Sequence, residues 1–154
     1  MNKYILGEFM SQFKIICVEW DSLQVTLLRV VREQVFIREQ QYPAETEWES
    51  CEIQAIHLVA LDTQGNPIGN IRLLPSGEIG RVAVIANWRK QGVDSALLMK
   101  ILEIAQARAY PKIFLHAQTH AIPFYQKFGF TVCGEVFEDA KIPHQKMFLN
   151  TVTI

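Results

Sequence analysis

The apolar positions of this chain recur with two periods, and the early part of the chain mainly shows the strand pattern. Residues 13–19 and 56–62 are apolar runs of strand length, and residues 68–74 follow the second run after the sequence TQGNP. Gly and Asn-Pro at such a position are typical of a tight turn. A fourth run over residues 78–86 follows another turn, LLPSGE. We therefore expect the last three runs to pair as antiparallel hairpins.

Two segments have the spacing of amphipathic helices. In residues 23–40 the apolar side chains recur at intervals of three and four, after Asp21 and Ser22, either of which is a suitable N-cap. The apolar positions of this helix are Leu23, Leu27, Leu28, Val31, Val35 and Phe36. A second helix is expected over residues 93–109, before Pro111. Its buried stripe is expected to consist of Leu97, Ile101, Ile104 and Ala105, with Leu98 and Leu102 beside it.

The remaining segments complete a sheet. A strand over residues 112–117 follows the second helix, so a crossover should place it parallel to residues 81–86. A short helix over residues 122–128 ends at a glycine, which is a common C-cap. Strands over residues 130–138 and 146–152 then close the sheet as an antiparallel pair. The elements predict one mixed α/β (α+β) domain that is mostly antiparallel and has one parallel crossover pair.

Length and composition fit a single globular domain and exclude several classes of protein. The domain is expected over residues 12–154, and residues 1–11 are interpreted as a disordered leader or a start-site artefact, because Met10 could also initiate. The net charge is -1, so the chain has no basic excess for binding nucleic acid. No apolar run approaches the roughly 20 residues of a membrane span. Three separated cysteines without a CxxC pair favour reduced thiols in the cytoplasm, and no metal site is expected.

The stretch WRKQGVDSALLMK, residues 88–100, has the composition of an anion-binding turn. The first turn of a helix leaves backbone N–H groups without internal partners, and the helix dipole adds positive potential there. A glycine before the helix allows close approach, and Arg89 and Lys90 add positive charge. From this spacing alone an ordinary capped helix remains the favoured interpretation. A phosphate or pyrophosphate is the natural ligand if the turn does bind one.

Two ordered motifs resemble those of the GNAT acetyltransferase superfamily. The segment RKQGVDSALL resembles the pyrophosphate-binding turn Arg/Gln-x-x-Gly-x-Gly/Ala of that superfamily. The segment HAQTHAIPFYQKFGF resembles its next landmark, Asn-x-x-Ala-x-x-Phe/Leu-Tyr-x-x-x-Gly-Phe, with Gln118 at the Asn position. The outright matches are Ala121, Phe124, Tyr125, Gly129 and Phe130. Residues 31–47, 117–130 and 134–147 further resemble the ElaA-like bacterial branch, so the resemblance covers nearly the whole chain.

The resemblance implies a cytoplasmic N-acetyltransferase that uses acetyl-coenzyme A as co-substrate. In such proteins two central strands splay apart to hold the cofactor's pantetheine arm. Carried over, the backbone of Val82, Ala83 and Val84 would pair with this arm. The pyrophosphate would be held by the turn residues Arg89, Lys90, Gln91, Gly92, Val93, Asp94 and Ser95. Further cofactor contacts would come from Gln118, Phe124 and Tyr125.

The acceptor implied by the resemblance is a primary amine on a small molecule or a protein, and homodimers are common in the superfamily. Tyr125 would act as general acid toward the leaving thiolate. Without the resemblance, a core tyrosine would be the favoured interpretation of this residue. The general base stays open, and a base that acts through water is one alternative. Glu78 and Arg81 flank the central strand, and the other candidates are Glu33, Glu39, Glu45, His57, His116, His120 and His144. For His144, lining the acceptor pocket and anchoring the last turn are equally favoured.

Position 94 departs from the family pattern, which has Gly or Ala where this chain has Asp94. A carboxylate about 4 Å from a phosphate charge would oppose binding by about 4 kcal/mol before screening. Aspartate is also favoured in the first turn of a helix, where it satisfies N–H groups. We expect weakened but retained coenzyme A binding. The alternatives are a non-catalytic module that binds acyl-coenzyme A or a protein partner, and a structural domain without cofactor.

Overall fold

A computed structural model describes residues 12–20, 24–39 and 54–149. The strands are β1 (Phe13–Val18), β2 (Ile56–Asp62), β3 (Pro67–Leu73), β4 (Glu78–Val84), β5 (Ile113–Gln118), β6 (Phe130–Asp139) and β7 (Ile142–Leu149). The α-helices are α1 (Val25–Arg32), α3 (Val93–Ala107) and α4 (Ile122–Gln126). Shorter or wider helical turns are η1 (Glu33–Glu39), η3 (Ala86–Trp88) and η4 (Thr119–Ala121). The expected leader, Asp21, Ser22 and the acidic segment after Gln40 lie outside the described residues.

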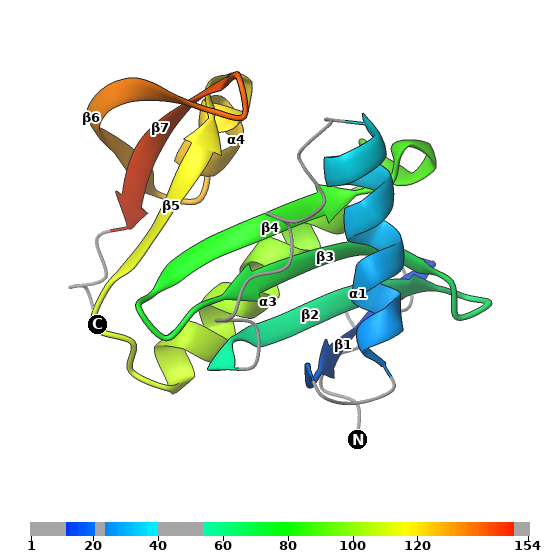
Figure 1. Cartoon of the computed structure of the whole chain (residues 1–154). Coiled ribbons are helices and arrows are strands. Elements are labelled where there is room, and N and C mark those ends of the chain that lie inside the picture. The colour runs from blue at the N-terminus through cyan, green and yellow to red at the C-terminus, as the bar shows by residue number, and fades with distance from the viewer. Residues whose placement is uncertain (1–11, 21–23, 40–53, 150–154) are drawn as a thin grey trace.

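The strands form one seven-stranded sheet in the order β1-β2-β3-β4-β5-β7-β6, in which β4 and β5 are parallel and the other pairs antiparallel (Figure 1). This arrangement confirms the predicted mixed fold. The predicted hairpin between β2 and β3 is closed by Asp62, whose Oδ1 accepts hydrogen bonds from the Gln64 and Asn66 amides at 2.9 Å each. The turn is therefore held by an aspartate that satisfies its backbone donors.

Helices cover both faces of the first four strands, with α1 on one face and α3 on the other (Figure 1). The α3 face holds the main core, in which Ile71, Leu97 and Ile101 are fully buried. On the α1 face Leu28 packs with Val59 of β2. The apolar spacing of both helices therefore identified their buried sides correctly. The first helix does not stay regular, because the backbone widens into π-helical turns from Glu33 to Glu39.

The last hairpin is longer than the sequence indicated, since β7 begins at Ile142 and not at residue 146. Its turn residues Ala140 and Lys141 both have positive φ, 53° and 67°. Two-residue turns of this kind usually contain Asn and Gly, which tolerate the left-handed region. Because the turn lacks these residues, the sequence did not reveal where the hairpin turns back.

The parallel pair at the centre of the sheet is short. Only Glu78 with Phe114 and Ile79 with Leu115 are paired between β4 and β5. On its other edge β5 pairs with β7 from Ile113 to Gln118. Beyond Leu115 β4 runs away from β5 (Figure 1). The strands thus diverge as expected for a sheet that is splayed at its centre.

Candidate active site

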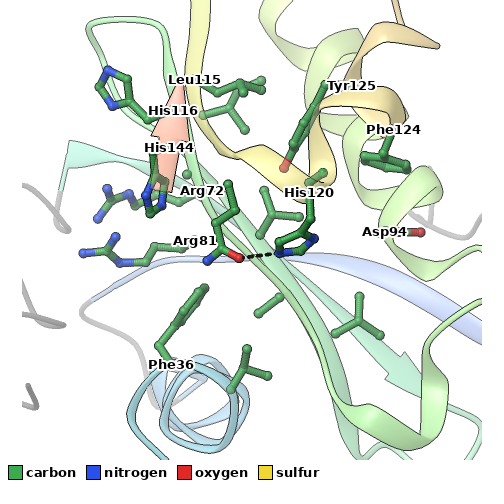
Figure 2. Close-up of a pocket in the computed structure, with 18 of the residues that line it drawn as sticks. Phe36, Arg72, Arg81, Asp94, Leu115, His116, His120, Phe124, Tyr125 and His144 are labelled. Carbon is green, nitrogen blue, oxygen red and sulfur yellow. Dashed lines mark hydrogen bonds between the residues drawn. The ribbon is translucent and has the colours of Figure 1, made fainter. Parts of the chain in front are cut away.

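A cavity of about 600 Å³ opens where β4 and β5 diverge. Its lining comes from β4, the end of β5, α4, β7 and the start of α3, and its floor includes Val35 and Phe36 from the π-helical segment (Figure 2). Residues that are far apart in the sequence therefore meet here. Of the expected site residues, those that line the cavity are Val82, Ala83, Val84, Arg89, Asp94, Gln118, Phe124 and Tyr125.

The β4 wall is irregular at the point where it enters the cavity. Its pairing with β3 shifts register between Asn70 and Arg72, and Arg81 has a φ of 52°. The buried Asn70 amide donates a hydrogen bond to the Arg81 carbonyl and so fixes this bulge. Past Ile79 the β4 edge has no β5 partner, and Val82 to Val84 line the cavity along this edge. Such an edge can pair with an extended ligand, as a further strand would.

The turn into α3 has the backbone geometry of a tight approach to the helix. Gly92 precedes the helix with a φ of 85°, and Lys90 also has a positive φ of 64°. A Cβ at Gly92 would meet nothing within 4 Å, so the turn faces open space. Arg89 donates from Nε to the Val84 carbonyl at 2.9 Å, which ties this cation to the end of β4. The turn is thus fixed to the same strand end that borders the cavity.

The other residues of the turn are less involved with the cavity. Lys90, Gln91, Gly92, Val93 and Ser95 do not appear among the residues that line it. Val93, the first residue of α3, is buried in the core, and Gln91 donates from its amide to the Asn87 carbonyl at 3.0 Å. A contact from this part of the turn would therefore come from backbone N–H groups at its open surface.

Asp94 combines two of the arrangements considered for it. Its Oδ1 accepts a hydrogen bond from the Ser95 amide at 2.8 Å, so it satisfies a donor of the first helical turn. Its side chain is also partly buried and lines the cavity (Figure 2). One of the N–H groups expected to hold a pyrophosphate is therefore already engaged by a carboxylate.

Tyr125 is held rigidly at the opposite wall. Its ring makes edge-to-face contacts with Phe124 and Phe130, at centroid distances of 5.1 and 5.9 Å. The side chain is 8% exposed, and its hydroxyl points into the cavity (Figure 2). Burial raises the pKa of the Tyr125 hydroxyl far above its ordinary value, and the negative charge of Asp94 raises it further. The hydroxyl therefore keeps its proton at any physiological pH.

The end of β5 supplies a polar contact between two expected residues. Gln118 is the last residue of β5, and its Oε1 lies 2.8 Å from Nε2 of His120 (Figure 2). Because the amide oxygen can only accept, the imidazole donates here. His120 is thereby used to orient Gln118 toward the cavity.

A second polar group occupies the β7 side of the cavity. His144 is 5% exposed, stacks against Phe137 at a centroid distance of 5.8 Å, and places Nδ1 2.7 Å from the Ile142 carbonyl oxygen. His116 lies 3.3 Å from the Glu78 carboxylate. His144 thus both anchors its turn and lines the cavity, which unites the two equally favoured interpretations.

The remaining candidates for general base fall elsewhere. His57 is fully buried under α1, where its Nδ1 lies 3.3 Å from the Arg32 guanidinium, and it does not line the cavity. Glu33 lies on the exposed side of the helix and is also absent from the lining. The side chains of Glu39 and Glu45 are outside the described residues.

Sequence reasoning missed Asn70 and Arg72 as site residues. Both lie on β3, where Asn70 fixes the bulge and the buried Arg72 lines the cavity. The signal was available, because two polar residues two positions apart share one face of an otherwise apolar strand. Such buried polar residues usually have a structural or functional partner. Among residues 12–20, 24–39 and 54–149, no cluster of His, Cys, Asp or Glu is arranged to hold a metal ion.

Comparison with known proteins gives a consistent class for this fold and cavity. The sequence profile of the acetyltransferase (GNAT) domain matches residues 24–151. The uncharacterized N-acetyltransferase YjcF of Bacillus subtilis is 41% identical over 122 residues, which cover 76% of this chain and 86% of YjcF. Two solved structures, an acyl-CoA N-acyltransferase from Pseudomonas aeruginosa and ElaA of Escherichia coli, each superpose with a TM-score of 0.81 at 27% identity and cover 90% of this chain and 99% of their own.

The fold is that of the GNAT acyl-CoA N-acyltransferases. The chain belongs to the GNAT acetyltransferase family and has ElaA-like homologues, as its motifs predicted. None of the helices in the described ranges is long and apolar enough to cross a membrane.

Proposed function

We propose that this protein transfers an acetyl group from acetyl-coenzyme A to a primary amine, by direct attack in a ternary complex. The observation that carries this proposal is the meeting of three features in one cavity: the unpaired edge of β4, the start of α3, and the Tyr125 hydroxyl. An extended thioester lying along β4 would place its reacting end between this edge and Tyr125. The amine acceptor, on a small molecule or a protein, would enter from the side of His144.

The described residues fit two parts of coenzyme A, the pantetheine arm along β4 and the pyrophosphate at the start of α3. Backbone groups of Val82 to Val84 suit the amide-containing pantetheine arm, because they are left without a β5 partner. The open turn at Gly92 and the first N–H groups of α3 suit a pyrophosphate. Gln118 and Phe124 border the space between these two features.

Acetyl transfer from a thioester requires a polarised carbonyl and a proton donor for the leaving sulfur. Backbone N–H groups of β4 can polarise the thioester oxygen as an oxyanion hole does. Tyr125 can donate its hydroxyl proton to the developing thiolate as general acid, because the hydroxyl is protonated at neutral pH.

A second candidate function is a non-catalytic module that binds acyl-coenzyme A or a protein partner. It is favoured by Asp94, which uses the Ser95 amide and adds negative charge beside the expected phosphate site. The two functions differ in turnover and not in fold.

Calorimetric titration with acetyl-coenzyme A and coenzyme A, followed by an amine panel, tests the proposal. The panel comprises spermidine, an aminoglycoside, a peptide with a free α-amine and an N-blocked peptide with one lysine. Micromolar binding with acetyl transfer to at least one amine is expected. Binding without transfer would support the module that binds acyl-coenzyme A. No binding at millimolar cofactor would refute the acetyltransferase and leave the module that binds a protein partner.

The role of Tyr125 is tested by Tyr125→Phe, which removes the hydroxyl and keeps the ring contacts. We expect kcat to fall by roughly 10²–10⁴-fold while the Kd of coenzyme A stays within about twofold. A variant with unchanged kcat at neutral and high pH would show that another group supplies the proton.

The setting proposed for this activity is the bacterial cytoplasm. It is supported by the bacterial relatives and by the wide separation of the three cysteines in the sequence. A homodimer is also proposed from the resemblance, and sedimentation of the purified protein would test it.

A further inference from the structure

We propose that His144 is the general base that takes the proton from the acceptor amine, with Nε2 as the accepting atom. This inference rests on the proposed acetyltransferase function and assigns the one role that the function leaves open. Primary amines are mostly protonated at neutral pH, since a lysine-type amine has a pKa of about 10.4. An ammonium has no lone pair, so it must lose a proton before it can attack a carbonyl.

The hydrogen bond of His144 sets which of its nitrogens can accept that proton. Nδ1 lies 2.7 Å from the Ile142 carbonyl oxygen, and a carbonyl oxygen can only accept a hydrogen bond. Nδ1 therefore carries the hydrogen of the neutral ring, and the lone pair resides on Nε2. Stacking against Phe137, with 22° between the planes, fixes the ring orientation. The residue is thus a positioned base and not a freely rotating surface histidine.

The position of His144 complements that of Tyr125. His144 on β7 pairs in register with Gln118, the last residue of β5, and Tyr125 lies in the helix that follows. Both side chains line the same cavity (Figure 2). The base and the acid therefore flank the end of β5, where the β4 edge is also open. An amine and a thioester meeting there would each have one proton-transfer group beside them.

The other titratable and charged groups around this part of the cavity are less suited to the role. They are Arg72, Glu78, Arg81, His116, His120 and Asp139. The Glu78 carboxylate and His116 are already paired at 3.3 Å, and His120 is bonded to Gln118. Asp139 is exposed near the hairpin turn. Among the described lining residues, His144 is the buried base whose tautomer is fixed by the fold.

The proton and electron balance of the transfer closes with these two residues. Nε2 of His144 removes one proton from the ammonium, and the neutral nitrogen forms a bond to the acetyl carbonyl carbon. The C–S bond breaks, and Tyr125 gives its hydroxyl proton to the sulfur. The new amide nitrogen gives up its second proton, which restores the Tyr125 hydroxyl through water. His144 returns its proton to solvent, so the net reaction releases one proton.

The test uses His144→Asn in the full-length chain, with the two peptides of the amine panel as acceptors. Asparagine can still donate from its amide to the Ile142 carbonyl, so the turn should survive, while the accepting nitrogen is lost. At pH 7 we expect kcat on the lysine peptide to fall by roughly 10²–10⁴-fold. The loss should shrink as pH approaches the amine pKa, about 10.4. It should also be smaller for the α-amine, whose pKa is about 8.

Three results would overturn the role of His144. They are a kcat within threefold of wild type at pH 7, a loss that is the same at every pH, and an equal pH-dependent loss in the matched variant His116→Asn. Long-range ¹H–¹⁵N NMR of the histidine rings provides a readout independent of turnover. It should show His144 protonated at Nδ1, and an Nε2–H tautomer would refute the proposal. If the wild type acetylates no amine, the acetyltransferase function itself fails, which is distinguishable from transfer that survives in His144→Asn.

Discussion

The two halves of the sheet differ in how they are supported. Strands β2 and β3 are buried at nearly every position, because α1 and α3 cover both of their faces. Strand β6 is exposed along most of its length, and β7 is buried only at His144 and Met147. The first half therefore carries most of the core. The second half, β5 to β7 with α4, supplies Gln118, Tyr125 and His144 to the cavity.

The halves share one hydrophobic core but are joined by few strand hydrogen bonds. Two residue pairs join β4 to β5, and the Phe114 amide donates to the Gly77 carbonyl at 3.1 Å just before them. The small number of β4–β5 pairs opens the cavity, because a fully paired β4–β5 ladder would leave no free strand edge. The site thus depends on a small seam between a well-packed half and a more exposed one.

The largest effect should come from replacing a core isoleucine of the first half by alanine, compared with the same substitution in the second half. Ile71→Ala removes a fully buried core residue of β3 and should lower the free energy of unfolding by about 3–4 kcal/mol. Ile142→Ala changes a partly buried residue of β7 and should cost about 1 kcal/mol. Urea unfolding of both variants measures the difference. Similar losses would show that the two halves contribute equally to stability.

The same contrast explains which features the sequence revealed. Periodicity identified the helix faces and the hairpin of β2 and β3 because burial there is strong and the turn Gly-Asn-Pro is distinctive. The start of β7 was predicted too late, because Ala140 and Lys141 form a turn with positive φ that alanine and lysine rarely adopt. The short motifs found the positions of Asp94 and Tyr125. Asn70 and Arg72 share one face of β3, but this spacing alone does not show that Arg72 lines the cavity, because that depends on where β4 and β5 diverge.

The seam itself can be broken at one glycine. Gly77 has a φ of 97°, and a Cβ there would lie 2.0 Å from the Lys112 carbonyl oxygen. Gly77→Ala should therefore force the halves apart and cost about 2–3 kcal/mol more than a change of backbone preference alone. Gly65→Ala is the matched control, because Gly65 has a φ of 86° and open space around it.

Thermal melting of the two glycine variants separates strain from clash. The control should lose about 1–2 kcal/mol, the usual penalty of a side chain in the left-handed region. If Gly65→Ala were as damaging as Gly77→Ala, the clash with Lys112 would not be what holds the seam.

A smaller effect is expected on coenzyme A affinity when the charge of Asp94 is removed from the first half. Asp94→Asn keeps an oxygen that can accept from the Ser95 amide but removes the negative charge beside the expected phosphate site. Coenzyme A affinity should rise by about tenfold, roughly 1.4 kcal/mol, because screening at this partly exposed position reduces the full Coulomb energy. Calorimetric titration at two salt concentrations measures the gain, which should shrink at high salt. An unchanged Kd would mean that the carboxylate is too far from the bound phosphates to matter.

The smallest effect is on the pH dependence of the free energy of unfolding, and it comes from Tyr125. The negative charge of Asp94 in the first half contributes to the raised pKa of this tyrosine in the second half. A raised folded-state pKa favours the neutral hydroxyl, so its stabilisation is complete below the unfolded pKa of 10.0 and is lost as pH rises above it. By pH 10.5 this loss amounts to about 0.8 kcal/mol for wild type and is absent in Tyr125→Phe. Urea unfolding at pH 8 and pH 10.5 measures the difference.

Asp94→Asn separates the two causes of this alkaline loss. Burial is the larger cause of the raised pKa, so removing the charge should leave most of the loss between pH 8 and pH 10.5 in place. A wild type and a Tyr125→Phe variant with parallel pH dependence would instead show that Tyr125 ionises without cost in the folded state. The hydroxyl would then be in contact with water in the folded state, which would contradict its burial.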